Sequence, residues 1–511
     1  MVCSLAVFAI KHKIFPENKL IPETPESIVH IIPCYNETAD ELTRALDSLV
    51  NQTNIDQHRR AFIIICDGRV YGPGMEKTTA DCLFDDILIV QKTHKSIKAA
   101  YIAWTHSLLD VEVQSGSYRG VPYYCIVKQQ NQGKRDSLVC VRSFLYTFNN
   151  RTANPTAIFS PAFFSDMARF LTNDADIQNV DVLIGMDADT VFAESCVSEL
   201  LSESRYPGTV GVCGYVQVDF SRSKWGNWSP WSLYQSTEYT ISQGLRRLHQ
   251  STVTKKVSCL PGCCQLLRVC ETTCGNRILY ELFGYCPKPT DSLLRHIRST
   301  ASEDRNHVCL MLSAFPNAQT RQALRAHAYT DVPHSWSVFL SQRRRWTLGA
   351  TVNDLFLISA PGIQWFERIL ALTNCLVWFV NIFVLASIAN LIVAALSRLL
   401  ILINSFEANM FTDVDWWIIL SFSSVMIFPV IYYICIVFWL PPTLFQKLQY
   451  LLGMVMYLIC GPFINIIVLV YSLYNMDSFG WGKTRKVVSE ENDEKGGEND
   501  EESQIGLERV V

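Results

Sequence analysis

Short apolar runs and a helical pattern alternate in the first part of the chain. The runs are rich in Ile and Val and span Ile28–Pro33, Ala61–Cys66, Tyr123–Val127 and Val180–Met186. Runs of this length and composition are typical of buried parallel strands. Between the first two, Glu37–Gln52 repeats Leu42, Leu46 and Leu49 at helical spacing. Strand, helix and strand in this order predict a doubly wound α/β domain.

Longer apolar runs follow toward the C-terminal end. Three stretches carry no charged residue, namely Ile369–Leu396, Trp416–Leu440 and Tyr450–Tyr474. Each exceeds the roughly 20 residues that cross about 30 Å of hydrocarbon, whereas buried helices of soluble proteins fit runs of about 10–14 residues better. The pattern therefore predicts membrane helices. The number and direction of the crossings stay open. Three crossings would place Lys483, Arg485 and Lys486 on the side opposite the large domain, which conflicts with the preference of basic clusters for the cytoplasmic side.

The two ends differ from both of these parts. Met1–Ile10 is apolar but too short to span a membrane, so it is expected to lie at the interface or to be the remainder of a longer N-terminus. From Val487 onward, nine acidic residues oppose two basic ones, which gives −7 there and leaves +3 of the total of −4 for the rest. A tail so poor in apolar residues predicts disorder. The chain resembles no basic domain, so a nucleic-acid partner is not expected.

The composition agrees with a chain made of two parts that differ in polarity. Hydrophobic residues make up 49% and charged residues 18% of the 511 positions, with a mean hydropathy of +0.14. The charged fraction is below the ~25% of a soluble protein. It is nevertheless too high for a bundle of membrane helices alone, which supports a polar domain joined to an apolar one.

Polar residues follow the predicted strands directly. In doubly wound sheets, ligands bind beyond the carboxyl ends of the strands. These ends carry Pro33–Glu37, Cys66–Gly68, Lys128 and Asp187–Asp189. Two carboxylates after an apolar strand can hold a hard divalent ion and leave positions open for phosphate oxygens, with a solvated turn as the alternative.

Three further positions carry candidate chemistry. Lys134 follows Gly133, but the spacing is not that of a P-loop. Lys134 could supply a positive charge to a diphosphate, and the alternative is that it lies in an exposed loop without such a role. Glu303 and Asp304 fit either a solvated helix start or a general base near the rim.

The stretch Gln342–Trp346 has the sequence Gln-Arg-Arg-Arg-Trp. Gln342, Arg345 and Trp346 share one helix face, which offers an amide, a guanidinium suited to diphosphate and an indole that can stack on a sugar. Arg343 and Arg344 are expected to point elsewhere, toward lipid headgroups. A basic juxtamembrane anchor is the alternative.

The order of these motifs resembles that of the processive family-2 glycosyltransferases. Two more stretches, Cys259–Cys263 and Gly480–Lys486, narrow the resemblance to chitin synthases, and Ser335-Trp336 before the Gln-Arg-Arg-Arg-Trp motif supports it. The resemblance covers roughly residues 28–486. The chain departs from it at Thr347–Ala350, where the family often has Ile-Asn-Ser-Thr, and at Gln243, where a His is frequent.

The resemblance implies a membrane-embedded, inverting enzyme with an A-type nucleotide-diphospho-sugar glycosyltransferase domain, a doubly wound mixed sheet, and a C-terminal α-helical transmembrane region. The implied division is 1–27 N-terminal segment, 28–332 cytosolic glycosyltransferase domain, 333–368 amphipathic interfacial helices, 369–474 channel helices, 475–486 the Trp-Gly-Lys-Thr-Arg-Lys segment, and 487–511 disordered acidic tail. The implied reaction is transfer of N-acetylglucosamine from its UDP conjugate to the 4-hydroxyl of a β-1,4-linked chitin chain, with the polymer passed across the bilayer.

The resemblance also assigns expected roles. Residues expected at the donor are Tyr35, Glu37, Asp67, Lys134 and Asp187, with Asp189 binding Mg²⁺ or Mn²⁺. Asp304 is expected to be the base, with Arg345 on the diphosphate. Residues expected at the acceptor and channel entrance are Glu303, Gln342, Trp346, Cys259, Pro261, Gly262 and Cys263.

Rival readings stay open at this point. A hyaluronan synthase would need a second donor, and an inactive scaffold that binds polysaccharide would not need Asp187, Asp189, Asp304 and Trp346 together. The cysteines between Cys259 and Cys274 are expected to be free thiols rather than zinc ligands. A multi-pass protein of the plasma membrane with its catalytic domain in the cytosol is expected, with a homodimer as an option.

Overall fold

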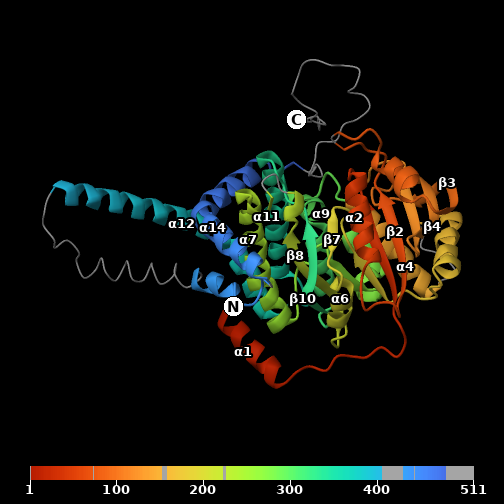
Figure 1. Ribbon diagram of the computed structural model, residues 1–511, viewed down its shortest axis with the longest axis horizontal. Coiled ribbons are helices and arrows are strands. Elements are labelled where there is room, and N and C mark those ends of the chain that lie inside the picture. Colours follow the sequence, from red (N-terminus) through yellow and green to blue (C-terminus); the bar gives the residue numbers. More distant parts are fainter. Residues whose placement is uncertain are drawn as a thin grey trace, which may run out of the picture.

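A mixed sheet forms the centre of the larger domain of the protein (Figure 1). The computed structural model describes residues 2–72, 74–151, 158–222, 226–404, 430–441 and 443–478. Its sheet has the strand order β3-β4-β5-β2-β1-β6-β9-β8-β10-β7. The strands are β1 Ser27–Cys34, β2 Arg59–Cys66, β3 Gln91–Ile102, β4 Leu108–Tyr118, β5 Val121–Lys128, β6 Val182–Gly185, β7 Thr190–Phe192, β8 Thr209–Val218, β9 Gln265–Arg268 and β10 Gln319–Thr330.

The predicted strands form the parallel centre of this sheet. β1 pairs in parallel with β2 on one side and β6 on the other, and β2 pairs in parallel with β5. Cys34 at the end of β1 is level with Cys66 at the end of β2. The carboxyl ends of these strands therefore open on one edge, and the doubly wound mixed sheet is confirmed.

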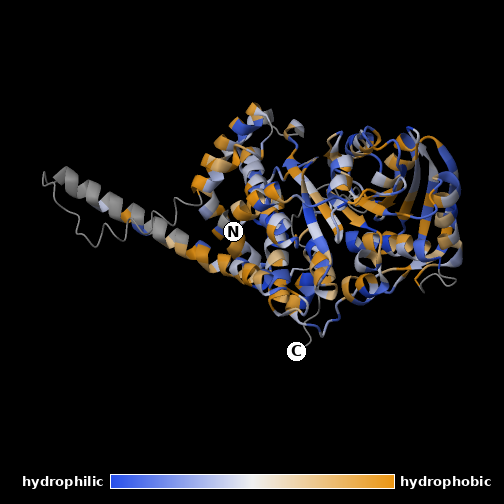
Figure 2. Ribbon diagram, turned by 90° about the horizontal axis from the view of Figure 1, so that it is seen from below, coloured by the Kyte–Doolittle hydropathy of each residue, from blue (hydrophilic) through white to orange (hydrophobic). Residues whose placement is uncertain are grey.

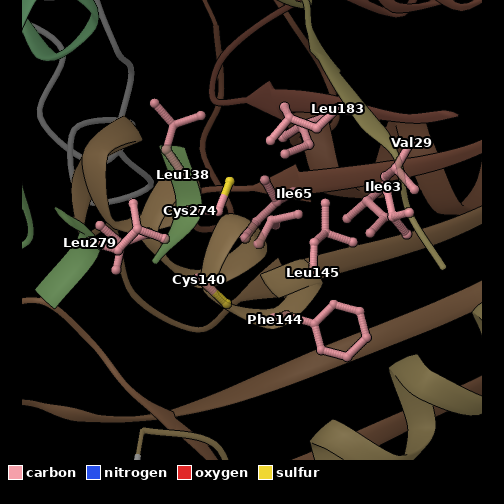
Figure 3. Close-up of a cluster of buried hydrophobic side chains, with 14 of the residues drawn as sticks. Val29, Ile63, Ile65, Leu138, Cys140, Phe144, Leu145, Leu183, Cys274 and Leu279 are labelled. Carbon is pink, nitrogen blue, oxygen red and sulfur yellow. The ribbon is translucent and has the colours of Figure 1, made fainter. Parts of the chain in front are cut away.

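Side chains of the central strands alternate between two apolar layers. On one side Val29, Ile31, Ile63 and Ile65 join a core that includes α4, and on the other Ile28, Ile32, Phe62 and Ile64 join a core that includes α2. Because successive strand residues point to opposite faces, burial on both faces needs an unbroken apolar run. Figure 3 shows the first layer, with labelled side chains Val29, Ile63, Ile65, Leu138, Cys140, Phe144, Leu145, Leu183, Cys274 and Leu279.

Helices cover both faces of the sheet, and a further group of long helices lies beside the sheet domain (Figure 1). Helices of the sheet domain are α2 Ala39–Val50, α3 Thr79–Asp81, α4 Gly133–Asn150, α5 Pro161–Arg169, α6 Cys196–Ser204, α8 Glu271–Cys274, α9 Leu293–Thr300 and α10 Glu303–Ala314. The remaining helices are α1 Val2–Ile14, α7 Pro230–Ser242, α11 Trp336–Ser359, α12 Trp365–Asn404 and α14 Leu444–Tyr474. α2 begins with a capping box, in which Thr38 accepts from the Glu41 N–H and Glu41 accepts from the Thr38 N–H.

Two of the predicted apolar runs lie in long helices. Ile369–Leu396 falls within α12 and Tyr450–Tyr474 within α14. Among the described residues, Trp365–Phe383 and Leu444–Tyr474 are long and apolar enough to cross a membrane. α12 projects away from the sheet domain, and its coloured part is largely hydrophobic in Figure 2. Most of Trp416–Leu440, the segment Gly480–Lys486 and the acidic tail lie outside the described residues.

A glycine contact sets the spacing between α14 and α7. A Cβ on Gly453 would lie 2.3 Å from Thr237 Oγ1 and 2.4 Å from the Leu233 carbonyl oxygen. The backbones of the two helices therefore touch at this point. α7 also lines the candidate site described below, so this contact joins the apolar helices to the site.

Gly453→Ala is expected to destabilise the protein by about 1–3 kcal/mol, because the new methyl group overpacks against backbone. Gly461→Ala on the same helix is the control. Its Cβ would meet nothing closer than 3.9 Å, and alanine is the better helix former. Thermal unfolding midpoints in detergent should fall for the first variant and stay level or rise for the second. Equal midpoints would contradict this packing.

Candidate active site

A cavity of about 670 Å³ opens at the carboxyl ends of β1, β2 and β6. Its volume is in the range of small-molecule sites. All of the residues to which the resemblance assigned a role line it, namely Tyr35, Glu37, Asp67, Lys134, Asp187, Asp189, Cys259, Pro261, Gly262, Cys263, Glu303, Asp304, Gln342, Arg345 and Trp346. The cavity thus joins the strand ends, the Cys259–Cys263 loop, the start of α10 and one face of α11.

A buried carboxylate forms the floor beyond β2. Asp67 pairs with Lys128 at 2.6 Å and accepts from the Gln132 N–H at 2.9 Å. Its Oδ2 is buried and has no hydrogen-bond partner among the described residues. Lys128 is fully buried and also pairs with Asp136 at 3.0 Å. The expectation that Lys128 joins the rim is therefore wrong, because two carboxylates hold it in the interior, where it orients Asp67.

The other residues of this wall lie near Asp67 in the cavity. The carboxylate of Glu37 accepts from the Tyr35 N–H at 2.6 Å. Burial raises the pKa of the Tyr35 phenol above its ordinary value. Tyr35 therefore stays neutral and presents an aromatic ring with a polar tip, which suits contact with a base or sugar.

Lys134 stands at the centre of the charged groups. It occupies the first turn of α4, and its Nζ lies 2.5 Å from Asp187 and 3.8 Å from Glu303. Burial alone would lower the pKa of this ammonium, but Asp187, Asp304 and Glu303 raise it above the ordinary value. Lys134 is therefore a permanent cation that links the strand-end carboxylates to α10.

Asp304 has the surroundings of a base with a raised pKa. Its Oδ2 accepts from the Gly262 N–H at 2.7 Å, and its buried Oδ1 has no hydrogen-bond partner among the described residues. Burial raises its pKa to about 6, against the lowering effect of Lys134 and with help from the charge of Glu303. For Glu303, burial would also raise the pKa, but Lys134 and Arg345 bring it below the ordinary value. The adjacent carboxyl groups thus have pKa values on opposite sides of the ordinary range.

The predicted face of α11 borders the same cavity. Gln342, Arg345 and Trp346 all line it, and Trp346 is 42% exposed. Burial lowers the pKa of Arg345, while Glu303 and Asp304 raise it in opposition. The Arg345 Nε is buried without a hydrogen-bond partner among the described residues. An amide, a cation with spare donor capacity and an accessible indole therefore lie side by side.

The expectation that Arg343 and Arg344 point to lipid headgroups is wrong. Arg343 is 4% exposed and binds Glu238 of α7 through two nitrogens, at 2.6 and 3.2 Å. Arg344 is 6% exposed and donates to the Asn475 carbonyl at 3.2 Å, just past α14. α11 is packed by other helices on several sides, so successive arginines find protein partners in different directions.

Residues of α7 and its C-terminal turn were not predicted as part of the site. Tyr239, Gln243 and Arg247 line the cavity, and the Tyr239 ring lies 5.8 Å from that of Trp346. Gln243 accepts from the Val216 N–H at 2.8 Å and donates to the Val216 carbonyl at 2.7 Å. The glutamine that replaces the frequent histidine thus fastens α7 to β8. The stretch Gln235–Tyr239, with the sequence Gln-Ser-Thr-Glu-Tyr, also resembles a motif of chitin synthases, and it is the signal that could have found this wall.

The carboxylates fit a metal ion that is shared with a substrate. Asp187 and Asp189 both line the cavity after β6, and both are partly exposed. Within the described ranges, no group of three or more His, Cys, Asp or Glu side chains could hold a metal ion. This arrangement suits Mg²⁺-like ions, which take one or two carboxylates plus substrate phosphates and waters. The nearby cysteines Cys259, Cys263, Cys264, Cys270 and Cys274 are free thiols.

Comparisons with known proteins agree with these features. A family model described as chitin synthase matches residues 3–509. Chitin synthase 8 of Gibberella zeae is 46% identical over 474 residues, which cover 93% of this chain and 69% of that protein. Chitin synthase 8 of Verticillium dahliae is 43% identical over 405 residues, which cover 75% of this chain and 66% of that protein.

Among solved structures, the mannosyltransferase PcManGT from Pyrobaculum calidifontis, in complex with GDP-Man and Mn²⁺, is similar at a TM-score of 0.41 and 10% identity, covering 93% of this chain and 95% of that one. The match to the family model extends through the strand ends, the Cys259–Cys263 loop and the arginine-rich helix. The chain belongs to the chitin synthase family of glycosyltransferases.

Proposed function

We propose that this protein transfers N-acetylglucosamine from UDP-N-acetylglucosamine to the 4-hydroxyl of a growing β-1,4-linked chitin chain, processively and with inversion. The main support is that the strand-end carboxylates, Asp304 and the helix face of Gln342, Arg345 and Trp346 line one cavity. The chain that forms this cavity belongs to the chitin synthase family. The cavity supplies a separate group for each part of the reaction.

The strand-end wall is assigned to the donor. The Asp67 Oδ2, which has no hydrogen-bond partner in the part of the chain that the structure describes, offers a buried acceptor for an N–H of the uracil ring. Tyr35 and Glu37 line the same cavity. Asp187 and Lys134 are assigned to the ribose-diphosphate side. Asp189, with Asp187 nearby, would hold Mg²⁺ or Mn²⁺, and the ion when bound would neutralise the diphosphate oxygens.

The transfer step is assigned to α10 and α11. Asp304 takes the proton from the acceptor 4-hydroxyl, whose oxygen attacks the anomeric carbon from the face opposite the leaving UDP. The bond from the sugar to the diphosphate oxygen breaks as the new one forms, which inverts the anomeric centre. Arg345 stabilises the charge that develops on UDP. Gln342, Trp346 and Glu303 hold the acceptor sugar in register with the donor.

The remaining helices are assigned to the polymer. The residues Cys259, Pro261, Gly262 and Cys263 line the cavity and would border the channel entrance. A polysaccharide cannot cross hydrocarbon unaided, because its many hydroxyl and amide groups would lose their hydrogen bonds to water. A chain that is elongated beside the apolar helices can instead leave between them. We therefore place the protein as a multi-pass protein of the plasma membrane, with its catalytic domain in the cytosol and the bilayer as a partner. A homodimer is compatible with this arrangement.

The test uses membranes that contain the full chain, labelled UDP-N-acetylglucosamine and a divalent ion. Chitinase-sensitive polymer is expected, and its loss on chelation with recovery on Mg²⁺ or Mn²⁺ supports the metal assignment. Polymer that forms only with added UDP-glucuronate and resists chitinase would favour the hyaluronan alternative. UDP binding without any polymer would favour the polysaccharide-binding scaffold.

The pH dependence of synthesis tests Asp304 separately. A base must be deprotonated, so kcat/KM is expected to fall as pH drops through about 6 rather than through the range of an ordinary aspartate, because burial raises the pKa of Asp304. Lys134 lowers the pKa of Asp304, so Lys134→Met should shift the acidic side of the kcat/KM profile, where activity falls, to higher pH. Lys77→Met, at the surface pair with Asp86, should leave this side of the profile in place. A fall in kcat/KM only near pH 4 would contradict this assignment.

A further inference from the structure

A buried carboxylate behind the cavity joins three of the elements that line it. Asp354 lies on α11 and is 1% exposed. It accepts two hydrogen bonds from the Arg246 guanidinium, at 2.9 and 3.1 Å, and one from Arg305 at 3.4 Å. Arg246 belongs to the helical turn after α7, and Arg305 follows Asp304 on α10. The Asp354 side chain therefore connects α10, which carries Asp304, to α11 and to the turn after α7.

The charges of this cluster make Asp354 necessary to both arginines. The Arg305 and Arg246 side chains are 14% and 23% exposed, so water screens them little. Burial would lower the pKa of Arg305, but Asp354 and the neighbouring Cys259 raise it above the ordinary value. Cations out of water need a partner. Without Asp354, Arg305 would turn toward other acceptors or toward water.

Close packing around α10 makes such a movement matter at the reacting carboxylate. A Cβ on Gly349 of α11 would lie 2.4 Å from the Ser302 Cβ, so α11 touches the start of α10 directly. A Cβ on Gly262 would lie 2.8 Å from both Asp304 Oδ1 and Lys134 Nζ. A small displacement of α10 would therefore break the hydrogen bond from Gly262 to Asp304.

We propose that Asp354 is a positioning residue for the transfer step, which acts through Arg305 to keep Asp304 in place against the Cys259–Cys263 loop. It touches neither the donor wall nor the cavity itself. The inference rests on the proposed function, since it assigns Asp354 to the step that Asp304 carries out. It goes further in naming a carboxylate outside the cavity that the reaction depends on.

The experiment measures polymer synthesis and UDP binding on the same membranes carrying the full chain. For Asp354→Asn, we expect kcat per UDP-binding site to fall about 10–100-fold, as for a displaced reacting group, with KM for the donor unchanged. Normalising to UDP-binding sites separates positioning from loss of folded protein, because a merely structural role would lower the number of sites and leave kcat per site unchanged.

Two further variants and a control make the test decisive. Arg305→Gln breaks the same link from α10 and leaves Asp354 paired with Arg246, so it is expected to fold and to show the same loss of kcat per site. Arg246→Gln keeps the link between Asp354 and Arg305, so its kcat per UDP-binding site should fall less than that of Arg305→Gln. Asp86→Asn, which removes the charge from a 2.7 Å surface pair with Lys77 outside the lining of the cavity, should match the wild type.

The possible results divide cleanly. If Asp354→Asn and Arg305→Gln both retain kcat per site close to that of the wild type, the inference is wrong. If Asp354→Asn yields no UDP-binding protein, Arg305→Gln decides in the same way. Failure of the proposed function looks different, because the wild type itself would then bind UDP and make no polymer.

Discussion

Asp304→Asn is expected to abolish polymer synthesis and leave UDP binding intact. The amide has nearly the shape of the carboxylate, and its oxygen can still accept from the Gly262 N–H, now found at 2.7 Å. It cannot take up a proton from the acceptor hydroxyl. Because a general base contributes about 10²–10⁴-fold, we expect a loss of about 10³-fold in kcat.

The measurement combines two assays on one preparation. Labelled UDP bound per protein should equal that of the wild type, and chitinase-sensitive polymer should fall to the detection limit. Glu303→Gln is the matched neighbour, since it removes one carboxylate from the same turn without removing the proposed base. Synthesis by Asp304→Asn within tenfold of the wild type would remove Asp304 from this role.

Arg345→Met is expected to lower kcat by about 10²–10³-fold, the usual cost of losing one group that stabilises transition-state charge. The fold should survive, because the Arg345 Nε has no hydrogen-bond partner among the described residues and burial already opposes its charge. The loss should appear in kcat more than in donor affinity, because UDP carries the extra charge only as it leaves.

Arg343→Met is the matched comparison, two residues away on α11. It leaves Glu238 without the guanidinium that now binds it at 2.6 and 3.2 Å. The Glu238 carboxylate is 28% exposed, so losing its partner costs less than the about 3–5 kcal/mol of a fully buried pair. This variant should therefore lose thermal stability and folded protein, whereas Arg345→Met keeps both. The reverse pattern would show that the two arginines have been assigned to the wrong roles.

The central strands were predictable because both of their faces are buried. β1 and β2 must be apolar at nearly every position, and a run of this kind is visible in one sequence. The edge strand β3 is mostly exposed and carries Lys92, Lys95 and Lys98, so it has no such run. β10 includes Arg321, whose guanidinium donates to the distant Glu17, and Gln322, whose backbone N–H donates to the distant Ser251 hydroxyl. These strands were missed because their polar positions are satisfied by tertiary contacts.

The candidate site divides in the same way. Side chains that directly follow strands, such as Asp67 and Asp187, could be placed on one edge from topology alone. The shared face of Gln342, Arg345 and Trp346 followed from helix geometry. Lys128 was misplaced, because its two carboxylate partners lie on other segments. Arg343 and Arg344 were misplaced for a similar reason, since α7 and the end of α14 supply their partners.

The amino-acid sequence by itself determined the local features of this protein: the buried strands, the long apolar helices, the strand-end carboxylates and the spacing of Gln342, Arg345 and Trp346. These depend on periodicity and on neighbours a few residues apart. Only the tertiary structure decided which charges face the cavity and which are neutralised behind it, as with Asp354. The physical reason is that the state of a buried charge depends on partners that the chain brings together from far along its length.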